Sequence, residues 1–197
     1  MEVQGPGLTL RTPRDDDAPA LLALASDPRV TNWFSWGPYR SIEEPAGYIA
    51  RLAGERERGE RLDLLIVHDE RGPAGITGFG ELSVRDRRAV IGTWLGREHW
   101  GTGVNTDAKA LMLKLAFTEL GLERVGAYTN PENARSLAAL EKVGFRREGT
   151  LRRFHRHGDE RHDVHVLSML REDWMRTPLA DVAFTLTGDV PPAFVVR

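Results

Sequence analysis

The sequence predicts an α/β fold in which strands and helices alternate along a single chain. Three observations support this prediction: short apolar runs typical of buried strands, longer segments with apolar residues at helical spacing, and a glycine turn that joins a strand to a helix. The predicted order of elements is β-α-α-β-β-β-α-β-α-β-β. With 197 residues, 41% of them hydrophobic, the chain can bury a sizeable core as one domain or as one domain with an appendage.

The individual elements are predicted from their periodicity and their end signals. Strands are expected at residues 8–12, 62–68, 74–84, 89–95, 124–129, 145–151 and 163–171. Helices are expected at residues 13–28, at residues 41–58, after the glycine turn, and at residues 133–142. Pro13 opens the first helix and Pro28 closes it, and the Ser41 to Glu44 segment is typical of a capping box.

The glycine turn is the most informative segment of the chain. Gly101 and Gly103 lie between the apolar run 89–95 and a segment with helical apolar spacing through Ala116. Glycines let the backbone adopt a positive φ and approach a ligand closely, and the free N–H groups of the first helical turn attract an anion. We therefore predict a phosphate or pyrophosphate ligand, with a plain connection as the alternative. The segment has neither the Gly-Lys-Ser/Thr of a P-loop nor the third glycine of a dinucleotide fingerprint.

Composition excludes several classes of function. The chain has no cysteine, which excludes disulfides, a thiol nucleophile and cysteine-ligated zinc. The net charge of −2 provides no global basic field for nucleic acid. We find neither a long apolar run that would span a membrane nor a secretory signal, so a cytoplasmic protein is the expectation.

The chain resembles the GNAT superfamily of N-acetyltransferases, and within it the RimJ/RimL-like branch of ribosomal-protein alanine acetyltransferases. Three motifs carry the resemblance: Ile91-Gly92-Thr93-Trp94-Leu95 followed by His99 to Ala108; Asn133-Ala134-Arg135-Ser136 with Leu140 and Val143-Gly144-Phe145; and Glu148-Gly149-Thr150-Leu151 with Asp163-Val164. The resemblance implies a mixed, splayed sheet flanked by helices that binds acetyl-CoA where two parallel strands part. It covers about Leu8 to Trp174, so we expect a GNAT-like domain at 1–174 and a C-terminal arm or hairpin at 175–197.

The resemblance also implies which residues bind acetyl-CoA. Backbone groups of two strand residues would pair with the pantetheine, amides of the glycine turn would hold the pyrophosphate, and an asparagine would hold the pantetheine. The expected cofactor-binding residues are Trp94, Leu95, His99, Trp100, Gly101, Thr102, Gly103, Val104, Asn105, Thr106 and Asn133. Glu98 departs from the family, which commonly has Gln or Arg there, and its charge is unfavourable beside a pyrophosphate unless it points away or pairs with Arg97.

Three residues are the candidates for catalysis. The resemblance places Ser136 near the sulfur, where its hydroxyl would protonate or stabilise the departing thiolate. His155 is the candidate general base, since imidazole titrates near neutral pH, and Glu81 on a neighbouring strand is the fallback. His155 is alternatively one of several ordinary surface histidines on a hairpin, and a zinc site built from these histidines is a remote alternative, so no metal is expected.

Three segments of the sequence are candidates for the acceptor side of the site. The aromatic loop at residues 33–39 is either a wall of the acceptor entrance or a set of core anchors. Arg152, Arg153 and Arg156 are candidates for binding an acidic acceptor or the 3′-phosphate of CoA. The C-terminal arm is expected to cap the acceptor site or to pair with another subunit of a homodimer.

Two hypotheses on function follow from these residues. The first is an N-acetyltransferase that moves an acetyl group directly to a primary amine of a protein N-terminus or a small molecule, since no cysteine is present to carry it. Alternatively, the chain transfers a longer acyl group such as succinyl, or it is a catalytically silent acyl-CoA-binding or regulatory module. Ser136 together with Asn133 and the glycine turn favours the enzyme.

Overall fold

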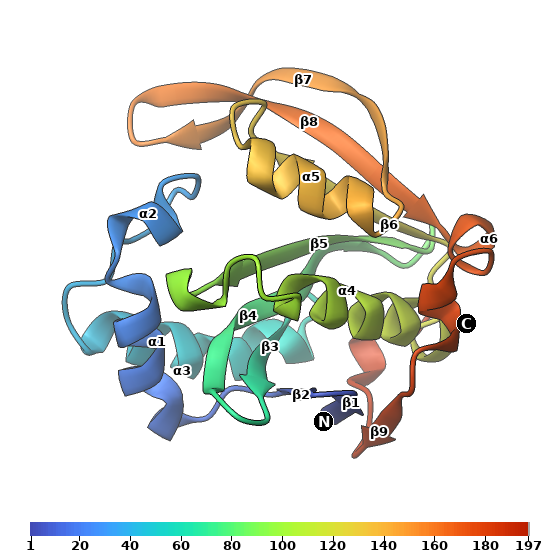
Figure 1. Ribbon diagram of the computed structural model, residues 1–197, viewed down its shortest axis with the longest axis horizontal. Helices are drawn as coiled ribbons and strands as arrows, with labels where there is room; N and C mark the ends of the chain where they lie inside the picture. Colours follow the sequence, from blue (N-terminus) through green and yellow to red (C-terminus); the bar gives the residue numbers. More distant parts are fainter. Residues whose placement is uncertain (197) are drawn as a thin grey trace.

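The computed structural model describes residues 1–196, which form a mixed sheet with helices on both faces (Figure 1). The strands are β1 Glu2–Gly5, β2 Leu8–Arg11, β3 Arg61–His68, β4 Gly72–Ser83, β5 Arg88–Leu95, β6 Arg124–Thr129, β7 Arg146–His157, β8 Glu160–Leu170 and β9 Thr185–Thr187. The helices are α1 Ala18–Ala25, α2 Pro28–Thr31, α3 Glu43–Glu57, α4 Val104–Lys114, α5 Ala134–Lys142 and α6 Arg171–Trp174. The nine strands lie in the order β7-β8-β6-β5-β4-β3-β2-β1-β9. The predicted mixed sheet with flanking helices is confirmed.

The sheet opens at one place, between β5 and β6. These strands are parallel and pair only along their first residues, from Arg88 opposite Arg124 to Val90 opposite Gly126. All other neighbouring strands in the sheet are antiparallel. Past Val90, β5 remains paired with β4 up to Leu95, while β6 remains paired with β8. The edge of β5 that faces β6 is therefore open at residues 91–95, which is the splay that the family resemblance implies.

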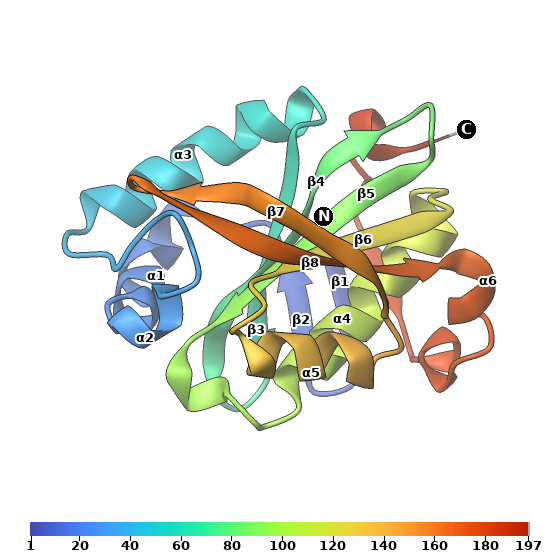
Figure 2. The same cartoon turned by 90° about the horizontal axis from the view of Figure 1, so that it is seen from above.

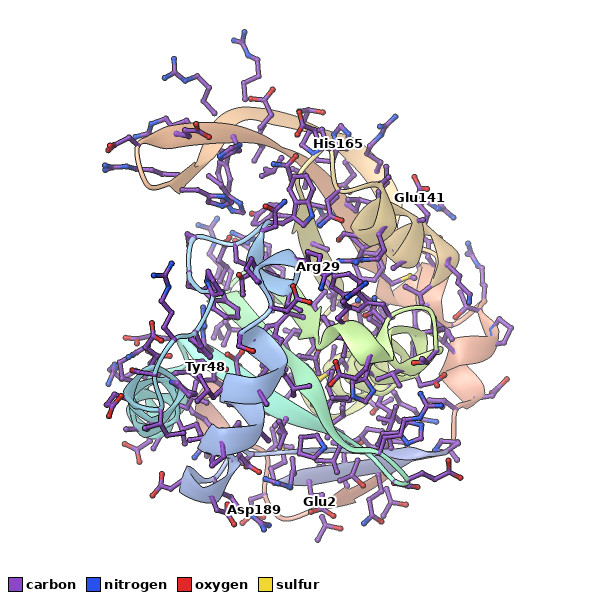
Figure 3. The ribbon with its side chains drawn as sticks, turned by 60° about the vertical axis from the view of Figure 1, so that its left-hand side comes forward. Glu2, Arg29, Tyr48, Glu141, His165 and Asp189 are labelled. Carbon is purple, nitrogen blue, oxygen red and sulfur yellow. The ribbon has the colours of Figure 1, made fainter. Side chains whose placement is uncertain are left out.

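Helices cover the two faces of the sheet unequally (Figure 2). α4 packs on β1, β2 and β4, and its apolar side, which includes Leu111 and Met112, lies in the main core. On the opposite face, α1 and α3 form a second, smaller core in which Leu21 and Ile49 pack against strand residues. The Tyr48 hydroxyl of α3 donates to Asp63 Oδ2 of β3 at 2.6 Å and fixes this helix to the sheet (Figure 3).

The chain beyond Trp174 packs on its own domain. β9 pairs antiparallel with β1, and Figure 3 places Glu2 and Asp189 together at one end of the molecule. The Phe194 side chain is fully buried in the main core, and Lys114 Nζ donates to the carbonyl of Val182 at 2.8 Å. In the described part of the arm, residues 175–196, we find neither a hairpin of its own nor a cover over the acceptor side.

The remaining differences from the predicted elements lie at their ends. Pro28 does not close the first helix but begins the short α2, which Asp27 caps by accepting from the Arg29 N–H at 3.0 Å. Of the two hydrogen bonds of the predicted capping box, the described residues form one, in which the Glu44 carboxylate accepts from the Ser41 N–H at 3.1 Å. α4 continues as a π-helical segment over Leu115–Glu119. Within residues 1–196, no helix has the length and apolar character needed to cross a membrane.

Candidate active site

A cleft of about 450 Å³ opens where β5 and β6 diverge. Its walls come from the aromatic loop after α2, the glycine turn, α4, α5 and the hairpin of β7 and β8. Most of the predicted site residues line it, namely Trp94, Leu95, His99, Trp100, Gly101, Gly103, Asn105, Thr106, Asn133, Ser136 and His155. Thr102, Val104 and Glu81 lie outside this lining. The tip of the hairpin extends away from α5 and, seen from above, lies over the start of α3 (Figure 2).

The glycine turn presents free N–H groups to the cleft. Gly101 and Gly103 have φ values of +75° and +97°, which confirms the predicted positive φ. The first backbone bonds of α4 run from the N–H groups of Thr106 and Asp107 to the carbonyl of Gly103. In residues 1–196, the N–H groups of residues 101–105 donate to no backbone carbonyl. They can hold an anion such as a pyrophosphate, which the positive end of the helix dipole also favours.

Thr102 and Val104 support this turn with their side chains instead of lining the cleft. The Thr102 hydroxyl donates to the carbonyl of His99 at 2.8 Å. The Val104 side chain is buried in the main core. These two residues therefore offer the cleft only their backbone N–H groups.

Trp94 and Leu95 lie on the open edge of β5. Ile76 and Gly75 of β4 pair with them on one side, and no β6 residue pairs with them on the other. The Trp100 indole Nε1 donates to the carbonyl of Leu95 at 3.0 Å, so one lone pair of this carbonyl is already occupied. Open ladder positions of this kind accept an extended amide chain such as pantetheine.

His99 is a buried residue of the cleft with one unpaired nitrogen. Its side chain is 3% exposed, and its Nδ1 atom has no hydrogen-bond partner among the described residues. Burial lowers the pKa of His99, which favours the neutral imidazole. An unpaired nitrogen that is buried in this way favours a neutral ring that packs in the wall of the cleft.

Glu98 lies outside the lining of the cleft. Its carboxylate is largely exposed and lines a separate depression together with Leu24, Asp27 and Arg97. Its Oε1 atom lies 3.9 Å from Nε2 of His99, so its charge is near one wall of the cleft without entering it.

Lys109 is a cleft residue that the sequence analysis missed. It lies one turn after Asn105 on α4, and its Nζ donates to the side-chain oxygen of Asn105. The side chain is 5% exposed, and burial lowers the pKa of Lys109 to about 7. No carboxylate among residues 1–196 forms an ion pair with it. Its spacing of four from Asn105 was the available signal, since both residues lie on one helix face.

Arg135 is a second cleft cation that was missed as a site residue. Its guanidinium lies over the Trp100 ring, with Cζ at 3.3 Å from the ring centroid. This contact joins the start of α5 to the glycine turn and contributes a cation–π attraction of about 0.5–2 kcal/mol. It places a positive charge next to the free N–H groups of the turn.

Asn133 and Ser136 lie at the start of α5. The Asn133 side-chain oxygen accepts from the Ser136 N–H at 3.1 Å and thereby caps the helix. Its side-chain NH₂ is left for a ligand, and the Ser136 hydroxyl is half-buried in the cleft wall. This local bond fixes the two residues relative to each other.

His155 belongs to an aromatic cluster that includes Tyr128 of β6. The two rings meet edge to face, with centroids 5.7 Å apart. The Tyr128 hydroxyl lines the same cleft and donates to Glu81 Oε2 at 3.1 Å. Glu81 has a φ of +50° at an irregularity of β4 and reaches the cleft only through Tyr128. Sequence reasoning missed Tyr128, because nothing local marks a strand tyrosine as a link between two distant groups.

Three histidines of the hairpin lie with their rings in contact. The rings of His155 and His157 stack with centroids 6.2 Å apart, and the ring of His162 is tilted against that of His157 with centroids 4.7 Å apart. In the part of the chain that the structure describes, no group of three metal-binding side chains is arranged to hold an ion.

The aromatic loop contributes to both the wall and the packing. Trp33, Phe34 and Ser35 line the cleft. Trp36 packs against Phe34 and against Trp94, with the Trp94 ring centroid at 5.5 Å. Three residues of the loop therefore line the cleft, while Trp36 packs on other aromatic rings outside the two core clusters.

Comparison with known proteins agrees with this geometry. The model of the acetyltransferase (GNAT) domain family matches residues 7–146. The chain belongs to the GNAT family. It is an N-acetyltransferase that uses acetyl-CoA, as the motifs around the glycine turn predict, and the family resemblance is confirmed.

Several relatives resemble this GNAT protein over most of their length. It is 31% identical to the uncharacterized N-acetyltransferase p20 of Bacillus licheniformis, over 85% of this chain and 94% of the relative. The uncharacterized N-acetyltransferase YoaA of Bacillus subtilis is 32% identical over 83% of this chain and 93% of its own. The structure is similar to that of Mycobacterium smegmatis RimJ in complex with CoA-disulfide, with a TM-score of 0.81, 26% identity, and coverage of 92% of this chain and 90% of that chain.

Proposed function

We propose that this protein transfers an acetyl group directly from acetyl-CoA to the primary amine of a protein N-terminus or a small molecule. The observation that carries the proposal is that Ser136 and His155 line one cleft with the anion-binding glycine turn. The absence of cysteine from the chain supports direct transfer, because no thiol is available for an acyl-enzyme intermediate. We place this activity in the domain at 1–174.

The residues of the cleft suggest how the donor is held. The pyrophosphate binds to the N–H groups of residues 101–105, with Thr106 beside it. The pantetheine amides bind to the open edge of β5 at Trp94 and Leu95, and to the free NH₂ of Asn133. These contacts direct the thioester toward Ser136, at the point where the strands part.

The chemical step needs one proton to leave and another to arrive. The neutral amine attacks the thioester carbonyl carbon, and His155 accepts the proton that the amine loses, directly or through water. The C–S bond then breaks, and the Ser136 hydroxyl stabilises the thiolate by a hydrogen bond or protonates it, in which case Ser136 regains a proton from water. If His155 is not the base, Glu81 accepts the proton through Tyr128, whose hydroxyl donates to the Glu81 carboxylate.

Calorimetry followed by a thiol-release assay on the same preparation tests this proposal. We expect acetyl-CoA to bind and thiol release to require an amine, in a panel of peptide N-termini and small primary amines. Succinyl-CoA serves as the control donor and should be used more slowly. Binding of acetyl-CoA without release by any amine would overturn the proposed transfer and favour a silent acyl-CoA-binding module.

A further inference from the structure

The cationic side chains of the described cleft wall differ in their surroundings. Arg156 folds back on the tip of its own hairpin, where its Nε donates to the carbonyl of Gly158 at 2.7 Å. Arg135 lies over the ring of a tryptophan, and Lys142 is exposed to water. Lys109 is the exception, because its side chain is 5% exposed and lies within the wall. Its position therefore needs a different explanation.

The Nζ atom of Lys109 lies at the level of the first turn of α4. Side chains of a helix point back toward its N-terminus, and Lys109 Nζ donates to the side-chain oxygen of Asn105. The backbone N–H of Asn105 is one of the N–H groups that the glycine turn leaves free. Lys109 therefore brings an amine to the place where the free N–H groups of residues 101–105 favour an anion.

The protein supplies only part of what this amine can bind. An ammonium has three N–H bonds, and Asn105 accepts one of them. The elements packed on α4 are β1, β2, β4, α5, the π-helical segment and the 3₁₀ turn Pro178–Asp181. Within residues 1–196, none of the charged side chains of α4 and these elements forms an ion pair with Lys109, namely Asp107, Lys114, Glu2, Arg11, Glu81, Arg135, Glu141, Lys142, Glu119 and Asp181. A buried amine without a counter-charge costs stability, which a bound anion offsets.

Resting on the donor placement proposed above, we propose that Lys109 binds the diphosphate of acetyl-CoA. Asn105 holds the amine in the free protein and shares it with a phosphate oxygen in the complex. The negative charges of the diphosphate supply the counter-charge that the described protein groups do not. Lysine suits this role, because its ammonium is a compact charge whose three donors can reach an amide oxygen and a phosphate at once.

This contact couples donor binding to the uptake of a proton. Burial lowers the pKa of Lys109 to about 7, so the amine is mostly neutral in the free protein at pH 8. A diphosphate in contact with the amine favours the charged form and raises the pKa again. Acetyl-CoA binding should therefore take up a proton at pH 8, and the contribution of Lys109 to affinity should fall as the pH rises above 7.

The first test is calorimetry with three donors that differ in their phosphates. Lys109→Met should raise the Kd of acetyl-CoA about tenfold, as the loss of a charged hydrogen bond does. The Kd of acetyl-3′-dephospho-CoA, which keeps the diphosphate, should rise by the same factor. The Kd of S-acetylpantetheine, which has no phosphate, should stay the same. Lys114→Met is the matched control, because Lys114 is a lysine of the same helix outside the cleft lining, and it should bind all three donors as the wild type does.

The second test measures the proton directly. The heat of acetyl-CoA binding at pH 8 is compared in Tris and in HEPES, which release different heats when they give up a proton. The wild type should take up about one proton more than Lys109→Met. The other titratable groups of the cleft lining, which include His99 and the hairpin histidines, are present in both proteins and cancel in this difference.

The outcomes separate this proposal from the donor placement on which it rests. Equal Kd values of acetyl-CoA in the wild type and Lys109→Met, or equal proton uptake, would overturn the role of Lys109. If the wild type still bound S-acetylpantetheine more weakly than acetyl-CoA, the phosphates would remain at the turn. A loss seen with acetyl-CoA but not with acetyl-3′-dephospho-CoA would assign Lys109 to the 3′-phosphate and overturn the diphosphate contact. A wild type that bound all three donors equally would overturn the placement of the phosphates, and the Lys109 contact with it.

Discussion

Ser136 is fixed at the start of α5 by the cap that Asn133 provides, and its hydroxyl faces the cleft. Because the proposed role concerns the departing thiolate, the hydroxyl matters in the transition state and little in the bound donor. We predict that Ser136→Ala lowers kcat by roughly 10²-fold and leaves the Kd of acetyl-CoA nearly unchanged. Steady-state kinetics and calorimetry measure the two quantities, with the exposed Ser26→Ala as the control. An unchanged kcat in Ser136→Ala would show that this hydroxyl takes no part in the reaction.

His155 is expected to act as a base, so its protonated form is inactive. The rate should therefore have an acidic limb, because a general base acts only in its unprotonated form. We predict that His155→Ala removes this acidic limb from the pH profile of kcat/KM. His165→Ala is the matched control, because His165 lies on the same hairpin outside the cleft and bonds to Thr150. A limb that survives in His155→Ala but disappears in Glu81→Gln would assign the base to the Glu81–Tyr128 pair.

Lys109 makes the stability of the protein depend on pH. Burial lowers its pKa to about 7, well below the usual value of 10.5, so the unfolded chain binds more protons than the folded chain between these two values. The free energy of unfolding therefore rises with pH in this range, by at most about 1.4 kcal/mol per pH unit, and the contribution is constant below pH 7.

We predict that Lys109→Met stabilises the protein at pH 7 and removes this rise between pH 7 and 9. Methionine fills the same volume without a buried charge. Urea unfolding at several pH values measures the effect, and Lys142→Met, at an exposed lysine on α5, should leave the pH dependence as it is. A wild-type protein whose stability falls from pH 7 to 9, by the same amount as in Lys109→Met, would contradict the prediction.

At the scale of elements, the glycine turn sets the position of the N-terminus of α4. Gly103 has a left-handed conformation, and a Cβ there would meet only ordinary contacts, with Asp107 Oδ2 at 3.7 Å. The cost of a side chain is therefore backbone strain of about 1–2 kcal/mol. We predict that Gly103→Ala destabilises the fold by about that amount and weakens acetyl-CoA binding severalfold, because relief of the strain turns the free N–H groups away.

Thermal unfolding and calorimetry measure the two effects of Gly103→Ala. Gly149→Ala is the control, since Gly149 has an ordinary φ and open space around its Cα. Full acetyl-CoA affinity in Gly103→Ala would show that the turn does not hold the phosphates.

At the scale of the whole molecule, the C-terminal arm is part of the fold. Phe194 is fully buried in the main core, and β9 extends the sheet beyond β1. We predict that Phe194→Ala costs about 3–5 kcal/mol of stability, as large cavities in a core do. Phe154→Ala, at a phenylalanine that is 44% exposed, should cost much less. Denaturant midpoints measure both variants, and equal midpoints would mean that the arm contributes little to the core.

Features that depend on neighbouring residues could be predicted from the sequence. The glycine turn, the Asn133 cap, the helical and strand periodicities and the absence of cysteine are local, and so the mixed fold, the acetyl-CoA donor and the family could be predicted. The hairpin of β7 and β8 was predicted too short, because its tip is charged and the apolar pattern stops before the backbone pairing does. β1 was missed for a similar reason, since it is a short strand of mixed polarity.

Contacts between residues distant in the sequence could not be predicted and are known from the structure. It buries Lys109 without a carboxylate among the described residues, joins Glu81 to Tyr128 and His155, places Glu98 outside the lining of the cleft, and seats the arm against β1. It also collects the cations of the cleft from three separate segments. These contacts depend on where the strands part and on how the helices pack across the sheet, and no local pattern encodes such long-range geometry.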